Sequence, residues 1–199
     1  MAKTDKVFPE LITKRLRLRQ FRPGDVEGMH ACFGDLEAMR YWNFPACKAT
    51  ADTARWVKAL AKAKSPHEWL GWAVAEKRGD RCLGMVNYHH REPHNRRLEI
   101  GYILAPGQQG KGLMTEAMQA VLDHCFVQLG VHRVEALIHP DNAASIRLAT
   151  RLGFRLEGGP LRDYWRNGET YMNTMMYGLI VGEQTWKSAV RRKPSAKPA

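Results

Sequence analysis

Two glycines at a strand-to-helix boundary are the first residues in this chain that could do chemistry. Gly110 and Gly112 lie between an apolar segment and the longest helical pattern, with Lys111 between them and Thr115 in the first helical turn. Glycine lets the backbone turn tightly and approach a ligand closely. The first amides of a helix have no partner within the helix, and the helix dipole adds partial positive charge there. This turn could therefore bind a phosphate on backbone amides, aided by the Lys111 ammonium and the Thr115 hydroxyl.

The glycine spacing alone does not separate a phosphate site from an ordinary turn, but three segments together form a stronger signal. Residues 109–117 read QGKGLMTEA, residues 141–145 read DNAAS and are followed by Leu152-Gly153-Phe154 and Glu157-Gly158, and residues 13–19 read TKRLRLR. Over residues 11–180 the chain resembles the GNAT N-acetyltransferases, in particular the branch of ribosomal-protein N-terminal acetyltransferases. It departs from the family pattern at Gly107, where Gln or Arg is usual, and Gln108 is expected to serve instead.

The resemblance implies acetyl-CoA as the cosubstrate and no metal. The backbone of one strand is then expected to bind the pantetheine arm, through Tyr102, Ile103 and Leu104. The turn and the helix start are expected to bind the pyrophosphate, through Gln108, Gln109, Gly110, Lys111, Gly112, Leu113, Met114 and Thr115. Asn142 matches a family position that contacts the cofactor, although a short oxygen-bearing side chain here can also cap the following helix.

Acetyl transfer to an amine needs a neutral nitrogen, stabilisation of the developing oxyanion, and optionally an acid for the departing thiolate. The resemblance makes Glu99 the candidate base, with a pKa raised by burial in the apolar run 98–104. The alternative is an ion pair with Arg96 or Arg97. Ser145 lies three residues after Asn142, on nearly the same helix face, and matches a serine proposed in relatives to protonate the thiolate. It can equally be a plain helix-surface serine.

The amine that accepts the acetyl group is expected to bind among aromatic side chains. The candidates for this pocket are Trp42, Phe44, Tyr88 and Trp165, together with Asn43 and Trp69. Aromatic residues are also common core fillers, so part of this set is expected to be buried instead. Acidic residues are not concentrated in these segments. With a basic body, we expect a small-molecule or peptide amine as the acceptor, such as a ribosomal-protein N-terminus or a small, neutral or acidic amine, rather than a polyamine.

The histidines and cysteines do not show metal-site spacing. His89, His90 and His94 surround Pro93 in a strand and loop, whereas a His-x-x-x-His zinc pair requires a helix. These histidines are expected to lie on the surface without a metal. The four cysteines are isolated in sequence and are expected to be reduced and structural.

Periodicity predicts the elements that must position these residues. Alternating or continuous apolar patterns predict strands at 15–20, 69–76, 82–89, 97–104, 133–139, 154–165 and 170–180. Helical spacing predicts helices from Pro23 to about Gly34, and at 36–41, 53–62, 112–129 and 142–151, with Trp56 facing inward. The expected fold is α/β and GNAT-like: a mixed, mostly antiparallel sheet of about seven strands with four or five helices. The resemblance adds that strands four and five splay apart.

Length and charge favour one domain with short extensions. We expect an N-terminal extension at 1–10, the catalytic domain at 11–182 and a disordered basic tail at 183–199. The formal net charge is +11, and removing the five cations of the last thirteen residues leaves +6. No segment is apolar enough for a membrane span or a secretion signal, so a cytoplasmic protein is expected, with a homodimer as one possibility.

Two other functions remain open from the sequence. One is a non-catalytic acyl-CoA-binding regulatory module, which loss of the proton-transfer groups would favour. The other is binding of nucleic acid through the basic tail, because clustered cations gain affinity for phosphates.

Overall fold

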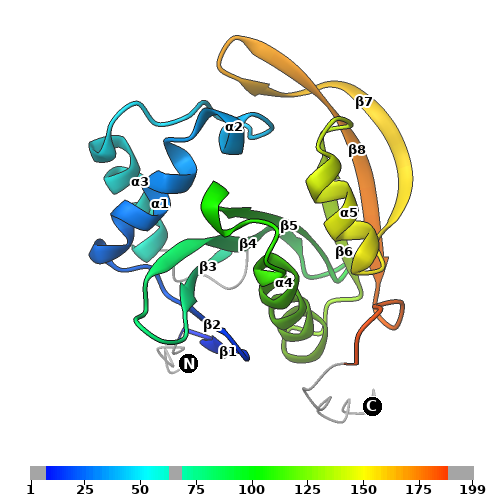
Figure 1. Ribbon diagram of the computed structural model, residues 1–199. Coiled ribbons are helices and arrows are strands. Elements are labelled where there is room, and N and C mark those ends of the chain that lie inside the picture. Colours follow the sequence, from blue (N-terminus) through cyan, green and yellow to red (C-terminus); the bar gives the residue numbers. More distant parts are fainter. Residues whose placement is uncertain (1–7, 63–68, 188–199) are drawn as a thin grey trace, which may run out of the picture.

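The protein is built on one eight-stranded sheet, seen in a computed structural model that describes residues 8–62 and 69–187 (Figure 1). The strand order is β1-β2-β3-β4-β5-β6-β8-β7. The strands are β1 (Leu11–Ile12), β2 (Leu16–Arg19), β3 (Leu70–Glu76), β4 (Cys82–Glu92), β5 (Arg97–Leu104), β6 (Arg133–Ile138), β7 (Arg155–Asn167) and β8 (Thr170–Ile180). All neighbouring strands are antiparallel except β5 and β6. The mixed, mostly antiparallel sheet is therefore confirmed.

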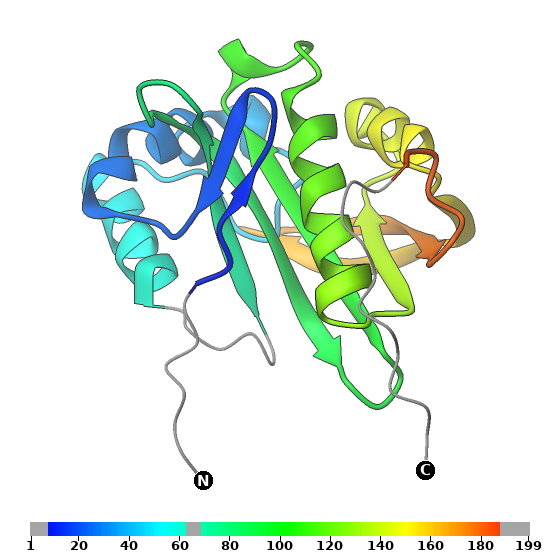
Figure 2. The same cartoon turned by 90° about the horizontal axis from the view of Figure 1, so that it is seen from below.

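Helices cover both faces of this sheet (Figure 2). They are α1 (Val26–Phe33), α2 (Leu36–Met39), α3 (Thr50–Lys62), α4 (Leu113–Asp123) and α5 (Ala143–Arg151). Because side chains alternate along a strand, Trp72 and Val74 of β3 join the core under α4, whereas Ala73 joins the core under α1 and α3. The two cores hold β4 and β5 rigidly between them.

Strands β5 and β6 separate part-way along their length. Their parallel pairing joins Arg97–Glu99 to Arg133–Glu135, with Glu99 opposite Glu135. Beyond Glu99, β5 continues beside β4, and β6 continues beside β8. The predicted splay between the fourth and fifth family strands is thus observed between β5 and β6, because β1 adds one short strand at the start of the chain.

Three local expectations were wrong. Strand β1 was not predicted, because its two residues are too few to show an alternation. The α-helical part of the predicted helix 112–129 ends early, at Asp123, and His124–Gln128 continues it as a wider π-helical turn. Gly130, with a φ of +66°, then follows the end of this turn, as predicted. Trp56 is 43% exposed rather than inward, and stacks on Phe44 with 4.7 Å between ring centroids.

The start of the predicted basic tail packs against the domain. Trp186 donates from Nε1 to Oδ1 of Asp123 at 3.1 Å, and Thr185 donates from its hydroxyl to the Arg151 carbonyl at 2.6 Å. Residues 185 and 186, at the start of the predicted tail, therefore contact the body. The predictions for residues 1–7 and 188–199 lie outside the described residues. Among the described helices, none combines the length and apolarity that a membrane crossing requires.

Candidate active site

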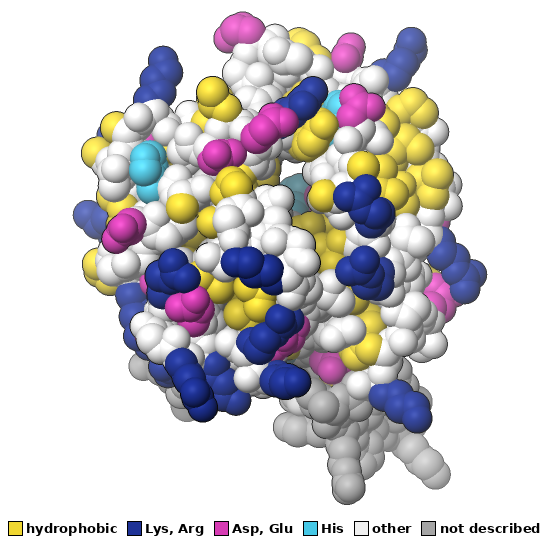
Figure 3. Space-filling model, viewed as in Figure 1, with side chains coloured by type: hydrophobic (Ala, Val, Ile, Leu, Met, Phe, Trp, Pro, Cys, Tyr) yellow, Lys and Arg dark blue, Asp and Glu magenta, His cyan; other side chains and the backbone are white. Residues whose placement is uncertain are grey.

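A cavity of about 860 Å³ lies at the splay, and Figure 3 shows it as a hollow between α2 and α5. Its walls come from β5, the turn before α4, the first turn of α4, β6, α5 and the segment around α2. Most of the residues predicted for the site lie in these walls: Trp42, Asn43, Glu99, Tyr102, Ile103, Leu104, Gln108, Gln109, Gly110, Gly112, Leu113, Met114, Thr115, Asn142, Ser145 and Trp165. One cavity thus joins the turn, the strand and the two candidate catalytic residues.

The turn before α4 presents free backbone amides. Gly110 and Gly112 have φ of +74° and +71°, a left-handed conformation that glycine adopts without strain. Gly112 is the N-cap of α4 and has no side chain to satisfy the first helical amides, so they remain available to an anion. Lys111 is placed differently from the prediction. Its ammonium donates to the Gly107 carbonyl at 2.7 Å and to Oε1 of Gln108 at 3.1 Å, and it does not line the cavity.

A partly exposed ionic clamp that was not predicted holds this turn. The Glu116 carboxylate, in the first turn of α4, accepts from the Thr13 hydroxyl at 2.6 Å and from the Arg15 amide and Nε at 2.7 Å each. Arg15 also donates to the Lys111 carbonyl at 2.9 Å. Burial raises the pKa of Glu116, but these donors and the Arg15 charge outweigh it and hold that pKa below its ordinary value. The N-terminal segment therefore fixes the turn.

The β6-facing edge of β5 offers further backbone groups. No strand pairs with this edge beyond Glu99 in the described chain, although the Leu104 carbonyl accepts from the Gln109 side chain at 3.2 Å. Asn142 caps α5, accepting from the Ser145 amide at 3.1 Å, so its capping role is observed while a cofactor contact stays a prediction. Burial raises the pKa of Tyr102 to about 12, and its phenol donates to the Ser145 carbonyl at 3.5 Å.

Glu99 is held by two histidines. Its side chain is 16% exposed, with Oε1 at 3.1 Å from His89 Nε2 and Oε2 at 3.1 Å from His90 Nδ1. Burial raises its pKa, but the hydrogen bonds and charges of the two imidazoles outweigh burial and lower it. The pKa is therefore lowered and not raised as expected. The alternative, an ion pair with Arg96 or Arg97, is not formed either, because Arg97 binds Glu92 and Glu135 and Arg96 donates to the Gly130 carbonyl.

Aromatic and acidic side chains also line the cavity. Trp42 and Trp165 lie in its wall, as do the carboxylates of Glu37 and Asp141. Tyr41 links α2 to the loop after β6, because its ring stacks on His139 at 4.8 Å between ring centroids. Among the described residues, the buried Nε1 of Trp165 has no hydrogen-bond partner.

Three residues predicted for the aromatic pocket lie elsewhere. Tyr88 is 0% exposed and packs against Trp72 in the core under α4, because its position on β4 directs it to that face. Phe44 lines a separate cavity of about 520 Å³ beside Trp56. Trp69 packs against the core under α1 and α3 and does not line the large cavity either.

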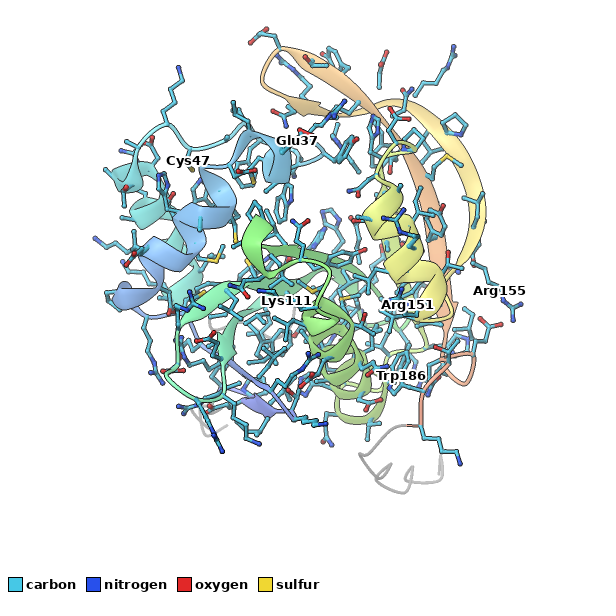
Figure 4. All side chains as sticks on the ribbon, in the orientation of Figure 1. Glu37, Cys47, Lys111, Arg151, Arg155 and Trp186 are labelled. Carbon is cyan, nitrogen blue, oxygen red and sulfur yellow. The ribbon has the colours of Figure 1, made fainter. Side chains whose placement is uncertain are left out.

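Sequence reasoning also missed several charged residues in the wall of the cavity. Arg147 and Arg151, one turn apart on α5, line the cavity, and so does Glu37 on α2; Figure 4 labels Arg151 and Glu37. Their i, i+4 spacing was a usable signal for a shared face of α5. Glu37 gave no such signal, because only the tertiary structure brings α2 over β5.

The sequence is similar to those of known acetyltransferases. Residues 15–155 match the family described as the acetyltransferase (GNAT) domain. An uncharacterized N-acetyltransferase of Bacillus subtilis (strain 168), YoaA, is 31% identical over 175 residues, covering 87% of this chain and 98% of the relative. Spermidine N(1)-acetyltransferase of Escherichia coli (strain K12) is 26% identical over 160 residues, covering 80% and 83%. The ribosomal-protein-serine acetyltransferase of the same strain is 33% identical over 106 residues, covering 53% and 58%.

Solved structures share the fold. A GNAT-family acetyltransferase from Bacillus anthracis superposes with a TM-score of 0.75 at 25% identity, covering 86% of this chain and 98% of that chain. The ribosomal L7/L12 α-N-protein acetyltransferase RimL, in complex with coenzyme A, superposes with a TM-score of 0.74 at 21% identity and the same coverage. The second likeness is one of fold alone.

Proposed function

This chain is an N-acetyltransferase that belongs to the GNAT family, and we propose that it transfers the acetyl group of acetyl-CoA directly to a primary amine. One observation carries the proposal: the anion-binding turn, the open edge of β5 and Glu99 lie in the walls of the same cavity. A direct transfer needs both substrates in one cleft, and this arrangement supplies it.

The residues present fit acetyl-CoA in three ways. The free amides at the start of α4 suit the pyrophosphate. The unpaired backbone edge of β5 around Tyr102–Leu104 suits the amides of the pantetheine arm. Arg147 and Arg151 add positive charge to the cavity wall. When bound, acetyl-CoA would supply an acyl group activated as a thioester.

Glu99 and Ser145 are proposed to move the protons. The amine nitrogen forms a bond to the acyl carbon and the carbon–sulfur bond breaks. Glu99 accepts the proton that the nitrogen loses, directly or through one water, and its lowered pKa keeps it ionised for this role. The Ser145 hydroxyl donates a proton to the leaving thiolate.

The cavity wall points to an amine that arrives as a cation. Glu37, Glu99 and Asp141 come from segments far apart in the sequence and all line the cavity. Carboxylates attract an ammonium group, which both a peptide N-terminus and a small polyamine carry. The Nε1 group of Trp165 could donate to a carbonyl, which a peptide has and spermidine lacks. We therefore propose a peptide α-amine, such as a ribosomal-protein N-terminus, as the first acceptor and a small-molecule amine as the second.

Calorimetric titration with acetyl-CoA tests the cofactor site. We expect binding by the wild type and its loss in Gly110→Pro, because proline cannot adopt a φ of +74° and lacks the amide proton. Gly79→Pro is the matched control, since it strains a glycine of similar φ in the hairpin turn between β3 and β4, outside the cavity. Absence of binding by the folded wild type would contradict the proposal.

Acceptor choice is tested by thiol release from acetyl-CoA with spermidine and with short peptides that have free or blocked N-termini. Transfer to free but not blocked peptides, with little transfer to spermidine, supports the first acceptor. The reverse pattern supports the small amine. Binding of acetyl-CoA without transfer to any amine would favour the acyl-CoA-binding regulatory module.

A further inference from the structure

Two adjacent histidines at the end of β4 contact one carboxylate. Neighbouring residues in a regular strand point to opposite faces. Here the pairing of β4 with β5 shifts register between His89 and Glu92, and His90 has a φ of +48°, in the left-handed region. The irregularity brings both imidazoles to Glu99, with 4.7 Å between their ring centroids. Left-handed conformations of non-glycine residues cost energy and often occur at functional sites.

Asn87 fixes the proton position on His89. Its side-chain amide satisfies all its neighbours when the oxygen accepts from Trp69 Nε1 at 3.1 Å and from His89 Nδ1 at 3.2 Å, while the nitrogen donates to the Gly101 carbonyl at 3.0 Å. This orientation is assigned from the hydrogen-bond network. His89 then has its proton on Nδ1, and Nε2 of the neutral ring is an acceptor.

An acceptor nitrogen facing a carboxylate oxygen needs positive charge between them. His89 Nε2 lies 3.1 Å from Oε1 of Glu99, and His90 Nδ1 lies at the same distance from Oε2. For His89, whose ring proton Asn87 holds on Nδ1, a second ring proton would supply that charge, and so would one metal cation shared by all three side chains. His90 can donate from Nδ1 to Glu99 in its neutral form, or bind the same cation through Nδ1. The ligand atoms of His89, His90 and Glu99 lie within 4.8 Å of one another, so one ion can reach all of them.

The donor set and spacing match a zinc site. Zn²⁺ bonds of 2.0–2.2 Å to imidazole nitrogen and carboxylate oxygen place neighbouring tetrahedral ligands about 3.3–3.6 Å apart. The two 3.1 Å separations require a small expansion, and the widest separations in the set, within 4.8 Å, require a contraction. Asn87 provides the outer hydrogen bond that orients a metal-binding histidine. Two neutral imidazoles and one carboxylate also leave a net negative charge for a divalent cation.

We propose that His89, His90 and Glu99 form a binding site for Zn²⁺, and that its occupation inhibits acetyl transfer. The metal would occupy the carboxylate oxygens that accept the proton of the amine. Binding follows from the geometry alone, whereas inhibition rests on the proposed role of Glu99. Because His89 and Glu99 line the cavity, the fourth metal position would face the amine side. This proposal differs from the sequence-based expectation of surface histidines without a metal.

Metal binding is tested on the full chain after removal of metal with a chelator. Zn²⁺ affinity is measured by competition with a chromophoric chelator, and Co²⁺ serves as a spectroscopic probe of four-coordinate geometry. We expect one Zn²⁺ per chain, with affinity reduced at least about tenfold in His90→Asn and in Glu99→Gln. Asparagine tolerates the left-handed backbone at position 90, so the first variant should fold. His94→Asn, an exposed histidine of the adjacent turn outside the cluster, is the matched control and should bind Zn²⁺ like the wild type.

Inhibition is measured as the ratio of acetyl transfer with and without Zn²⁺ in each variant. The wild type and His94→Asn should be inhibited at the concentrations that saturate the site, and His90→Asn should resist. No Zn²⁺ binding, or binding unchanged in both His90→Asn and Glu99→Gln, would overturn the site. Binding through these residues without inhibition would overturn the inhibitory role and question Glu99 as the base. Failure to find any acetyl transfer leaves the binding measurements decisive for the metal site.

Discussion

Glu99 and Glu116 are two carboxylates whose side chains are only 16% and 18% exposed, and they are held in different ways. Glu116 is held by a hydroxyl, a backbone amide and a guanidinium, all of which keep their protons across the physiological pH range. Glu99 is held by two imidazoles, whose side-chain type gains or loses a proton near neutral pH. Both pKa values are lowered.

The difference separates a carboxylate that holds the structure from one that we propose takes part in catalysis. The partners of Glu116 come from the β1–β2 segment, so its ion pair anchors the turn before α4 and does not line the cavity. Glu99 lines the cavity, and its partners are imidazoles, which are also common metal ligands. A lowered pKa alone therefore does not identify a catalytic acid or base, whereas the chemistry of the partners does.

The largest effect is expected for Glu99→Gln. Removal of a general base typically costs at least about 100-fold, and we expect kcat to fall by about that factor with little change in KM for acetyl-CoA. Steady-state kinetics across pH measure it. Glu135→Gln is the matched control, because Glu135 is the parallel partner of Glu99 and binds Arg97 and Arg133 instead. An unchanged rate in Glu99→Gln would remove the distinction between the two carboxylates.

Glu116→Gln should lower stability by about 1–2 kcal/mol at neutral pH, since it loses charged hydrogen bonds. The pKa of Glu116 is lower in the folded protein than in the unfolded chain, so the unfolded chain binds more protons on acidification. The stabilisation is complete above the ordinary glutamate pKa of about 4.3 and is lost as the pH falls through the lowered folded value. Urea unfolding at several pH values should show the difference from the wild type shrinking below about pH 4.3.

A difference in stability that does not change with pH would contradict the ionic clamp. Glu169→Gln is a suitable control, because its side chain is 99% exposed and pairs only with Arg166 at the surface.

The same Glu116→Gln variant should raise KM for acetyl-CoA about fivefold while leaving kcat near the wild-type value. The expected cause is a less rigid turn, whose amides must be reordered on binding at a cost near 1 kcal/mol. Initial rates at varied acetyl-CoA check it. A fall in kcat with unchanged KM would place Glu116 in the chemistry instead.

Ser145→Ala is expected to give the smallest effect, a decrease of kcat of about threefold. A thiolate leaves readily without full protonation, so an acid here contributes less than the usual range for general catalysis. Comparing the variant with Ser145→Thr, which keeps the hydroxyl, measures the role of that group. Equal rates in wild type and both variants would leave Ser145 as a residue of the α5 surface.

Local patterns predicted most of the fold. The bounds of β5 and β8 agree with the predicted ranges 97–104 and 170–180, since alternation and turn residues act over a few neighbours. The glycine turn was predicted for the same reason, because its φ values and its place before α4 are local properties. The roles of the individual site residues stay predictions, although the structure places most of them around one cavity.

Only the tertiary structure decided the partners. Glu116 and Arg15 are about a hundred residues apart in the chain, so no local pattern could pair them. The irregularity at His90 turns both imidazoles onto Glu99, and the burial of Tyr88 depends on which face of β4 the helix α4 covers. Periodicity fixes which residues share a face, but charge partners and cavity walls depend on long-range packing, which lies outside any short window of sequence.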